Sequence, residues 1–197
     1  MKAALLHYSV GNIRHLISYF KSLNINLDIV DSEINLDIYD LLVLPGVGSY
    51  NSSMEFLNKN NLSSQIIKHY NDSKKIIGIC LGFQILGKSS NENNISTNGL
   101  GIFNIHFKHL SQFKGYNNHK IPHIGWNNNF KSEFKYYYLH SYASEEIEYF
   151  PSDQIEIVDY DEINFISMIK TSNILATQFH PEMSDGNFDR HIMSFLS

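Results

Sequence analysis

The chain has 197 residues, 43% of them hydrophobic, so it is long enough to bury a substantial core. Its net charge of -5 and its scattered lysines and arginines exclude the broad basic field of a nucleic-acid-binding protein. A single cysteine excludes an intrachain disulfide framework, and no apolar run has transmembrane length or the form of a signal peptide, so we expect a cytoplasmic protein without membrane contact.

Short apolar runs alternate with helical patterns through the first half of the chain. Strands are expected at residues 3–8, 27–30, 39–44 and 76–80. Apolar residues recur at helical spacing from Ile13 to Leu23, around Met54, with Ser52 or Ser53 as N-cap, and from residue 62 to residue 67. This alternation predicts a mostly parallel sheet with helices on both faces, and ligands bind such sheets at the carboxyl ends of the strands.

The second half of the chain is expected to be mainly β-structure. A polar, Asn-rich loop is predicted at 89–98, and a last helix at 188–196. Strand-like runs occupy residues 102–107, 120–124, 135–139, 155–158, 165–169 and 174–178. They predict strands added to the same sheet and a smaller antiparallel layer. With no repeat and no obvious linker, residues 1–197 are expected to form one domain.

Cys80 stands in the pattern Gly-x-Cys-x-Gly, between an apolar run and a helical stretch. A reactive side chain between a strand and a helix, with small residues two positions away, is the layout of a nucleophile elbow. The N–H groups and positive dipole end of the following helix would favour the thiolate form of the sulfur. The pattern fits a small buried hydrophobe equally well, because free cysteines often serve only as core residues.

A second stretch, Thr177-Gln-Phe-His-Pro-Glu182, favours the nucleophile interpretation. In an extended segment, which Pro181 favours, His180 and Glu182 would point to the same face. A carboxylate beside an imidazole fixes its tautomer and stabilises its protonated form. If the strands that end near Cys80 and His180 are parallel neighbours, the three residues meet as nucleophile, base and orienting acid.

An oxyanion site is also available beside Cys80. The loop Pro45-Gly-Val-Gly48 follows a predicted strand and can present backbone N–H groups. The N–H of Leu81 directly follows the nucleophile, as an elbow requires. Taken alone, the loop fits a plain tight turn, and a phosphate-binding loop is excluded because no Gly-Lys-Ser or Gly-Lys-Thr follows it.

Three of these stretches together resemble the class I glutamine amidotransferases, which use a Cys-His-Glu triad: Leu-Pro-Gly-Val-Gly48, Gly78-Ile-Cys-Leu-Gly-Phe-Gln84 and Gln178-Phe-His-Pro-Glu182. Three more narrow the resemblance to HisH, the glutaminase subunit of imidazole glycerol phosphate synthase: Gly11-Asn-Ile-Arg14, Ile121-Pro-His-Ile-Gly-Trp-Asn127 and Tyr138-Leu-His-Ser-Tyr142. The resemblance spans nearly the whole chain. It implies a flavodoxin-like α/β fold and the hydrolysis of L-glutamine to glutamate and ammonia, with no metal and no cofactor.

The resemblance implies a role for each catalytic residue. Cys80 would attack the side-chain amide of glutamine, His180 would take the thiol proton and return it to the leaving ammonia, and Glu182 would orient His180. Gly48 and Leu81 lie where the family forms its oxyanion site.

Three further residues match positions that contact glutamine in the family: Gln84, Ser141 and Tyr142. The family makes these contacts mainly through backbone groups. Without the resemblance, Gln84 fits an ordinary amide on a helix surface equally well.

The resemblance further implies a partner. Ammonia passes to a separate (β/α)8-barrel cyclase subunit of the HisF type, in a heterodimer that works in L-histidine biosynthesis. The stretches that would face this partner contain Asn12, Arg14, Trp126 and Asn127. Trp126 by itself fits ordinary core packing as well as an interface.

The chain departs from the family pattern at two places that bear on the partner. HisH proteins commonly read Ile-Asp-Tyr-Gly where this chain has Leu6-His-Tyr-Ser9, and Met183 replaces a lysine on the partner side of the site. Neither change touches the triad. An alternative is therefore a HisH-like paralogue that, with a cyclase-like partner, supplies ammonia for amidation of a surface-polysaccharide sugar.

Two other classes of protein are less consistent with the sequence. A non-enzymatic binding subunit would be free to lose Cys80, His180 or Glu182, and all three are present. A cysteine hydrolase or peptidase of the same fold would have no reason to carry Gln84 and the HisH-like segments.

Overall fold

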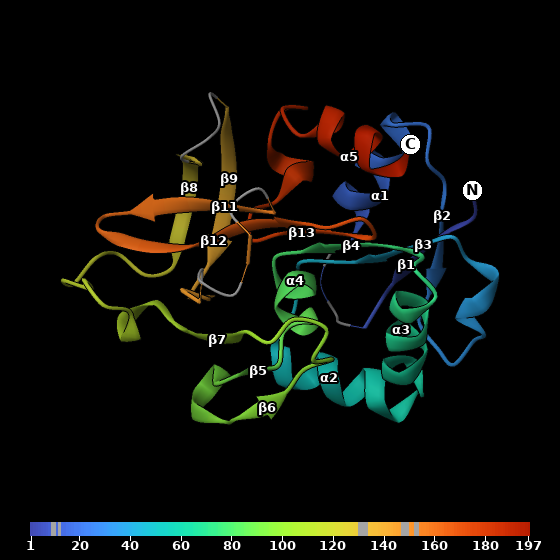
Figure 1. Cartoon of the computed structure of the whole chain (residues 1–197), viewed down its shortest axis with the longest axis horizontal. Helices are drawn as coiled ribbons and strands as arrows, with labels where there is room; N and C mark the ends of the chain where they lie inside the picture. The colour runs from blue at the N-terminus through green and yellow to red at the C-terminus, as the bar shows by residue number, and fades with distance from the viewer. Residues whose placement is uncertain (9–10, 12, 130–133, 147–149, 152–153) are drawn as a thin grey trace.

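The computed structural model describes residues 1–8, 11, 13–129, 134–146, 150–151 and 154–197, and its centre is a seven-stranded sheet (Figure 1). The strand order is β11-β12-β13-β4-β3-β1-β2. The strands are β1 (Ala3–Leu6), β2 (Leu27–Val30), β3 (Leu41–Leu44), β4 (Lys75–Ile79), β11 (Ile155–Tyr160), β12 (Ile163–Lys170) and β13 (Ile174–Thr177). The five strands from β13 to β2 are parallel, and β11 and β12 extend the sheet antiparallel, so the predicted fold class is confirmed.

The central parallel strands are short and mostly apolar. All residues of β1, β3 and β13 are buried, and in β4 only Lys75 is partly exposed. Strands covered on both faces need no polar alternation, which explains such runs. The edge strand β2 exposes Asp28 and Ile29, in keeping with its single neighbour.

Helices cover both faces of this sheet, as predicted. The helices are α1 (Arg14–Ser22), α2 (Tyr50–Lys59), α3 (Leu62–Asn71), α4 (Leu81–Leu86) and α5 (Asp189–Leu196). α1 and α5 lie on one face, and α2, α3 and α4 lie on the other (Figure 1). Each group packs into its own apolar cluster: Phe20 and Ile192 belong to one, and Leu57 and Ile66 to the other.

Helix α2 begins earlier than predicted. Its N-cap is Ser49, whose hydroxyl accepts a hydrogen bond from the N–H of Ser52 at 3.4 Å. The prediction of Ser52 or Ser53 as the cap is therefore wrong. Tyr50, the first residue of α2, is fully buried and precedes both serines.

The predicted loop at 89–98 contains two short strands and is not a plain loop. β5 (Ser89–Ser90) and β6 (Thr97–Asn98) flank a short 3-10 turn, η2 (Glu92–Asn94), and join β7 (His106–His109) and β10 (Tyr142–Ala143) in a small second sheet. The strand predicted at 102–107 is found later in the chain, because β7 begins only at His106. Phe103 and Ile105 are apolar because they pack into the core beside α4, not because they pair in a strand.

A two-stranded hairpin, β8 (His123–Asn128) and β9 (Lys135–His140), stands beside the main sheet (Figure 1). The strand predicted at 120–124 begins only at His123, because Pro122 has no N–H to pair. Two further 3-10 turns, η1 (Leu36–Ile38) and η3 (Leu110–Gln112), lie in connections. Within the described ranges, no helix is long and apolar enough to cross a membrane.

Candidate active site

Cys80 lies at the sharp turn between β4 and α4, with φ 46° and ψ -102°. A positive φ is strained for a residue with a side chain, and such strain is found at nucleophile elbows. The turn leaves no room around it. A Cβ added to Gly82 would lie 2.1 Å from the backbone oxygen of Leu44, and one added to Gly78 would lie 3.0 Å from the oxygen of Gly82. The elbow geometry predicted from Gly-x-Cys-x-Gly is therefore present.

His180 reaches Cys80 because β13 and β4 are parallel neighbours, with Thr177 opposite Ile79. The N–H of Cys80 donates to the carbonyl of Thr177 at 2.6 Å, which ties the elbow to the end of β13. Gly46 marks where the two side chains converge. A Cβ added there would lie 2.9 Å from Cε1 of His180 and 3.0 Å from Cβ of Cys80.

Glu182 is joined to His180 by a hydrogen bond. Nδ1 of His180 donates to Oε1 of Glu182 at 2.9 Å, and both side chains are buried. The local geometry differs from the prediction, because residues Pro181–Met183 form a 3-10 turn, η5, and only His180 itself is extended. Pro181 occupies the first position of that turn, where its missing N–H costs nothing.

The electrostatics of His180 follow from its neighbours. Burial alone would lower the pKa of His180, but the negative charges of Cys80 and Glu182 outweigh burial and raise the pKa to about 10. Because Nδ1 is held by Glu182, the second ring nitrogen, Nε2, is the one available to exchange a proton. Nε2 is buried and has no hydrogen-bond partner among the described residues.

The sulfur of Cys80 has two polar neighbours other than His180. Its Sγ lies 3.7 Å from the carbonyl oxygen of Leu139, to which the thiol can donate. The amide Nε2 of Gln178 donates to Sγ at 3.5 Å. Catalytic hydrogen bonds often tighten only when substrate is bound, so the open geometry at Nε2 of His180 is compatible with a nucleophile–base pair.

A cavity of about 230 Å³ opens directly over Cys80. Its lining brings together the residues that the sequence placed in the oxyanion and glutamine sites: Gly48, Leu81, Gln84, Ser141 and Tyr142. These residues come from three separate parts of the chain. Gathering them around one sulfur requires the parallel sheet and the β9–β10 corner together.

Gly48 is suited to an oxyanion loop by its backbone. Its φ of 115° is open to glycine but strained for other residues. The loop is anchored at its start, because the buried hydroxyl of Tyr8 donates to the carbonyl of Pro45 at 2.7 Å. Leu81, which also lines the cavity, is the first residue of α4 and directly follows Cys80.

Gln84 is buried in the site, so its interpretation as a helix-surface amide is wrong. Its Nε2 donates to the carbonyl of Tyr142 at 3.0 Å and lies 3.4 Å from Oε1 of Gln178. All six residues of α4 are buried, because this short helix is enclosed between the main sheet and the second sheet. Helical spacing alone could not reveal this.

Four lining residues were not among the individual site residues predicted from the sequence: Gly46, Glu92, Leu139 and His140. Glu92 is a carboxylate in the Asn-rich segment, and its Oε2 accepts a hydrogen bond from the N–H of Tyr50 at 2.8 Å. That segment was interpreted as a loop, so nothing connected Glu92 with Cys80. For His140, the available signal was its place in Tyr138-Leu-His-Ser-Tyr142.

The residues predicted to face a partner lie on elements that touch one another. α1, which begins at Arg14, contacts η5, and η5 contacts β9 of the hairpin that carries Trp126. Trp126 is 44% exposed, so its interpretation as a core residue is wrong. Met183 is 37% exposed, and the side chain of Asn127 donates to the carbonyl of Asp159 at 2.9 Å.

Asn12, also predicted at the interface, lies outside the described residues.

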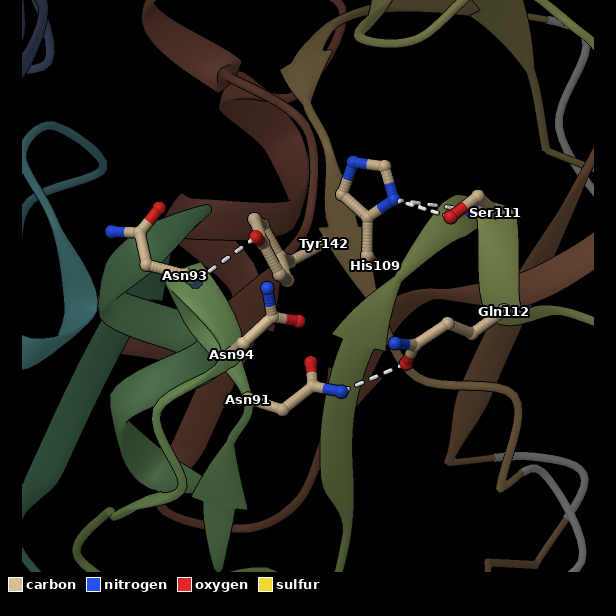
Figure 2. A pocket seen from close by; sticks show the side chains of 7 residues that line it. All are labelled: Asn91, Asn93, Asn94, His109, Ser111, Gln112 and Tyr142. Atoms are coloured by element: carbon tan, nitrogen blue, oxygen red, sulfur yellow. Dashed lines mark hydrogen bonds between the residues drawn. The ribbon is translucent and has the colours of Figure 1, made fainter.

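A second polar cavity, of about 290 Å³, adjoins the first and shares Tyr142 with it (Figure 2). In Figure 2, Asn91 and Gln112 face each other across its floor, and the Nδ2 of Asn91 donates to Oε1 of Gln112 at 2.8 Å. The ring of His109 stacks edge-on against Tyr142. Tyr142 is therefore a wall between an amide-rich cavity and the cavity over Cys80.

Comparison with known proteins agrees with this geometry. The family model "Glutamine amidotransferase class-I" matches residues 5–196. Two curated relatives, both described as imidazole glycerol phosphate synthase subunit HisH, are 34% identical to this chain. The protein of Prochlorococcus marinus (strain NATL2A) aligns over 93% of this chain and 90% of its own length. The protein of Leptospira interrogans aligns over 98% of both.

Solved structures show the same fold at lower sequence identity. A structure described as a glutamine amidotransferase superposes with a TM-score of 0.74 at 15% identity, covering 100% of this chain and 97% of its own. The PurLQS structure from Thermotoga maritima superposes with a TM-score of 0.71 at 19% identity, covering 100% and 99%.

Proposed function

This chain belongs to the class I glutamine amidotransferases, and from that premise we propose that it is the glutaminase subunit of an imidazole glycerol phosphate synthase. One observation carries the proposal. Cys80, at a strained elbow, and the His180–Glu182 pair follow the ends of adjacent parallel strands, and Cys80 lines a cavity. The cavity also contains the residues expected to bind glutamine.

The reaction begins with attack of the Cys80 sulfur on the side-chain carbonyl carbon of glutamine. The carbonyl oxygen becomes an oxyanion, which the N–H groups of Gly48 and Leu81 stabilise. His180 holds the proton taken from the thiol and delivers it from Nε2 to the leaving nitrogen, so ammonia departs and a thioester remains. Glu182 keeps Nε2 of His180 directed at the reacting atoms.

Water then completes the cycle. His180 removes a proton from a water molecule, which attacks the thioester carbon, and the second oxyanion collapses with loss of the Cys80 thiolate. The thiolate and the protonated His180 restore the starting pair. The sum is glutamine and water converted to glutamate and ammonia.

The ammonia is expected to pass to a (β/α)8-barrel cyclase subunit bound as a heterodimer. An exposed apolar face on the β8–β9 hairpin supports docking close to the site. Ile124, Trp126 and Leu139 are 51%, 44% and 44% exposed, and Ile124 and Leu139 are paired across the hairpin. Leu139 also lines the cavity over Cys80, so a partner on this face would meet the ammonia source. We place the pair in the cytoplasm, in keeping with the free thiol of Cys80.

A coupled glutaminase assay tests the proposal. The Cys80→Ser variant should lose glutamine hydrolysis while its circular dichroism and melting curve stay like those of the wild type. Hydrolysis by the wild type should be slow alone and should rise when a barrel cyclase subunit and its ligand are added, because binding of the partner is expected to order the oxyanion loop. Hydrolysis by Cys80→Ser at the wild-type rate would contradict the role of Cys80.

The same assay distinguishes the alternative pathway. Activation by a histidine-pathway cyclase supports the main proposal. Activation only by a cyclase-like partner from a sugar-modifying gene set would instead assign this chain to amidation of a surface sugar. Met183, exposed beside His180, replaces a lysine at the face where the two partners would differ.

A further inference from the structure

A chain of hydrogen bonds reaches Cys80 without passing through His180, and it begins at the carbonyl of Tyr142. A carbonyl oxygen can only accept, so both groups that contact it must donate. These groups are Nε2 of Gln84 and Nδ1 of His140, each at 3.0 Å. The Tyr142 carbonyl therefore fixes which end of the Gln84 amide is the nitrogen.

The orientation of Gln84 determines that of Gln178. Nε2 of Gln84 also lies 3.4 Å from the Gln178 side chain, so the atom facing this donor must be the oxygen, Oε1. The nitrogen of Gln178 then faces the other way, toward Sγ of Cys80 at 3.5 Å. Gln178 has no exposed surface, so no water competes for either contact.

The other branch of the chain holds the Tyr142 carbonyl in place. His140 uses Nδ1 as a donor, so its Nε2 accepts from Nδ1 of His123 at 3.2 Å. His123 is itself fixed, because its ring stacks between those of Tyr138 and Tyr160. The carbonyl that orients Gln84 is therefore anchored by packed side chains.

Two contacts of the sulfur have opposite preferences. The carbonyl of Leu139 accepts from the neutral thiol and would repel a thiolate. The N–H of Gln178 donates to either form and favours the anion. The other titratable groups around Cys80 in the described part of the chain are His180 with Glu182, Tyr8 and His140, and among these His180 is the one that supplies positive charge.

We propose that Gln178 is a further catalytic residue, whose amide N–H holds the sulfur of Cys80 and stabilises its thiolate. Gln84 and His140 are positioning residues that keep this N–H directed at the sulfur. The inference rests on the proposed function for its connection with glutamine, but the reactivity of the thiol can be measured without glutamine.

The first experiment measures the rate of alkylation of Cys80 by iodoacetamide in the full chain. At neutral pH the Gln178→Met variant, which keeps the size but loses the donor, should react roughly tenfold more slowly than the wild type. At alkaline pH, where the thiol is ionised in every variant, the rates should converge. A purely structural defect would lower the rate at every pH, and an unchanged rate at neutral pH would overturn the proposal.

Thr177→Val is the matched control. Thr177 is the buried neighbour of Gln178, and its hydroxyl donates to the carbonyl of Phe179, away from the sulfur. This variant should alkylate at the wild-type rate. A tenfold decrease in it would attribute the effect to disturbance of the strand end and would contradict the role of Gln178.

A second variant covers the case in which Gln178→Met does not fold. Gln84→Met leaves Gln178 in place but removes the donor that orients it, so alkylation should slow by a smaller factor. An unchanged rate would contradict the hydrogen-bond chain. In steady-state assays, Gln178→Met should lower kcat and leave KM unchanged, because Gln178 contacts the nucleophile and does not line the cavity.

The results for Gln178 and for the proposed function are distinguishable. Slow alkylation in Gln178→Met together with no glutamine hydrolysis in the wild type, with or without a barrel partner, would uphold the inference and remove the proposed function. Normal alkylation and normal kcat in Gln178→Met, together with glutamine hydrolysis by the wild type, would overturn the inference about Gln178 and leave the proposed function in place.

Discussion

The structure holds two buried pairs that contain histidine, His180–Glu182 and His123–His140, and the histidine pKa values shift in opposite directions in the two pairs. In the first pair, His180 donates to the carboxylate of Glu182 at 2.9 Å. In the second pair, His140 accepts from His123 at 3.2 Å, and neither contacts a carboxylate. The pKa of His180 is raised to about 10, whereas burial lowers the pKa of His123 to about 4 and that of His140 well below its ordinary value.

The difference shows that burial alone does not decide the charge of a histidine. Desolvation lowers the pKa in all three residues, and only the negative charges beside His180 reverse the direction. The first pair can therefore hold a proton, as the proposed reaction requires. The second pair stays neutral and works as a fixed support.

Among the changes that test this difference between the two pairs, removing the charge of Glu182 should have the largest effect. Glu182→Gln keeps the shape but offers an amide to His180, so the proton on His180 is less stable and its tautomer is no longer fixed. Glutamine hydrolysis should fall by about 10³- to 10⁴-fold. The measurement is kcat/KM with the barrel partner present, and a loss below tenfold would contradict the assigned role.

Removing the sulfur of Cys80 should reduce the difference in histidine pKa between the two pairs, with a smaller effect than the change at Glu182. In Cys80→Ala, the pKa of His180 should fall from about 10 toward its ordinary value, because one of the two negative charges is lost while Glu182 remains. Nuclear magnetic resonance titration of the His180 ring would show the shift. A pKa that stays near 10 would mean that Glu182 alone determines it.

The neutral pair should be visible in the stability of the fold at acid pH. Because the folded pKa of His123 is below the unfolded value, the unfolded chain binds more protons, and stability falls as pH decreases from about 6.5 toward 4. His123→Phe keeps an aromatic ring for stacking and removes the imidazole, and with it this contribution to the pH dependence of stability. The loss of unfolding free energy between pH 6.5 and pH 5 should be smaller by about 1–2 kcal/mol than in the wild type.

Denaturant titrations at the two pH values give this difference directly. His180 works in the opposite direction: its raised pKa adds stability that is complete below about 6.5 and is lost as pH rises toward 10. If His123→Phe leaves the loss of unfolding free energy between pH 6.5 and pH 5 unchanged, groups other than His123 are its main cause.

The smallest effect is expected at Tyr142, where the two branches meet. Its backbone carbonyl anchors Gln84 and His140, but its hydroxyl only accepts a hydrogen bond from the N–H of Asn93 at 3.3 Å, in the wall of the second cavity (Figure 2). Tyr142→Phe leaves the carbonyl intact, so kcat should change by less than about threefold. A larger decrease would indicate that the second cavity affects catalysis.

The sequence predicted the geometry around Cys80 more accurately than that of the segments farther from it. Gly-x-Cys-x-Gly indicated the elbow, because only small residues fit beside such a turn, and the apolar runs before Cys80 and His180 indicated two covered parallel strands. The segment at 89–98 was interpreted wrongly, since two-residue strands pair through backbone groups and leave no periodic pattern.

What the sequence determined by itself was local chemistry: a thiol in a tight turn, an imidazole near an acid, and helices alternating with strands. The tertiary structure decided which distant groups meet. Gln84 and Gln178 are 94 residues apart, and their amides can be oriented only by the Tyr142 carbonyl that a third segment supplies. Hydrogen-bond direction depends on atoms brought together by folding, so no spacing along the chain could have assigned Gln178 its contact with the sulfur.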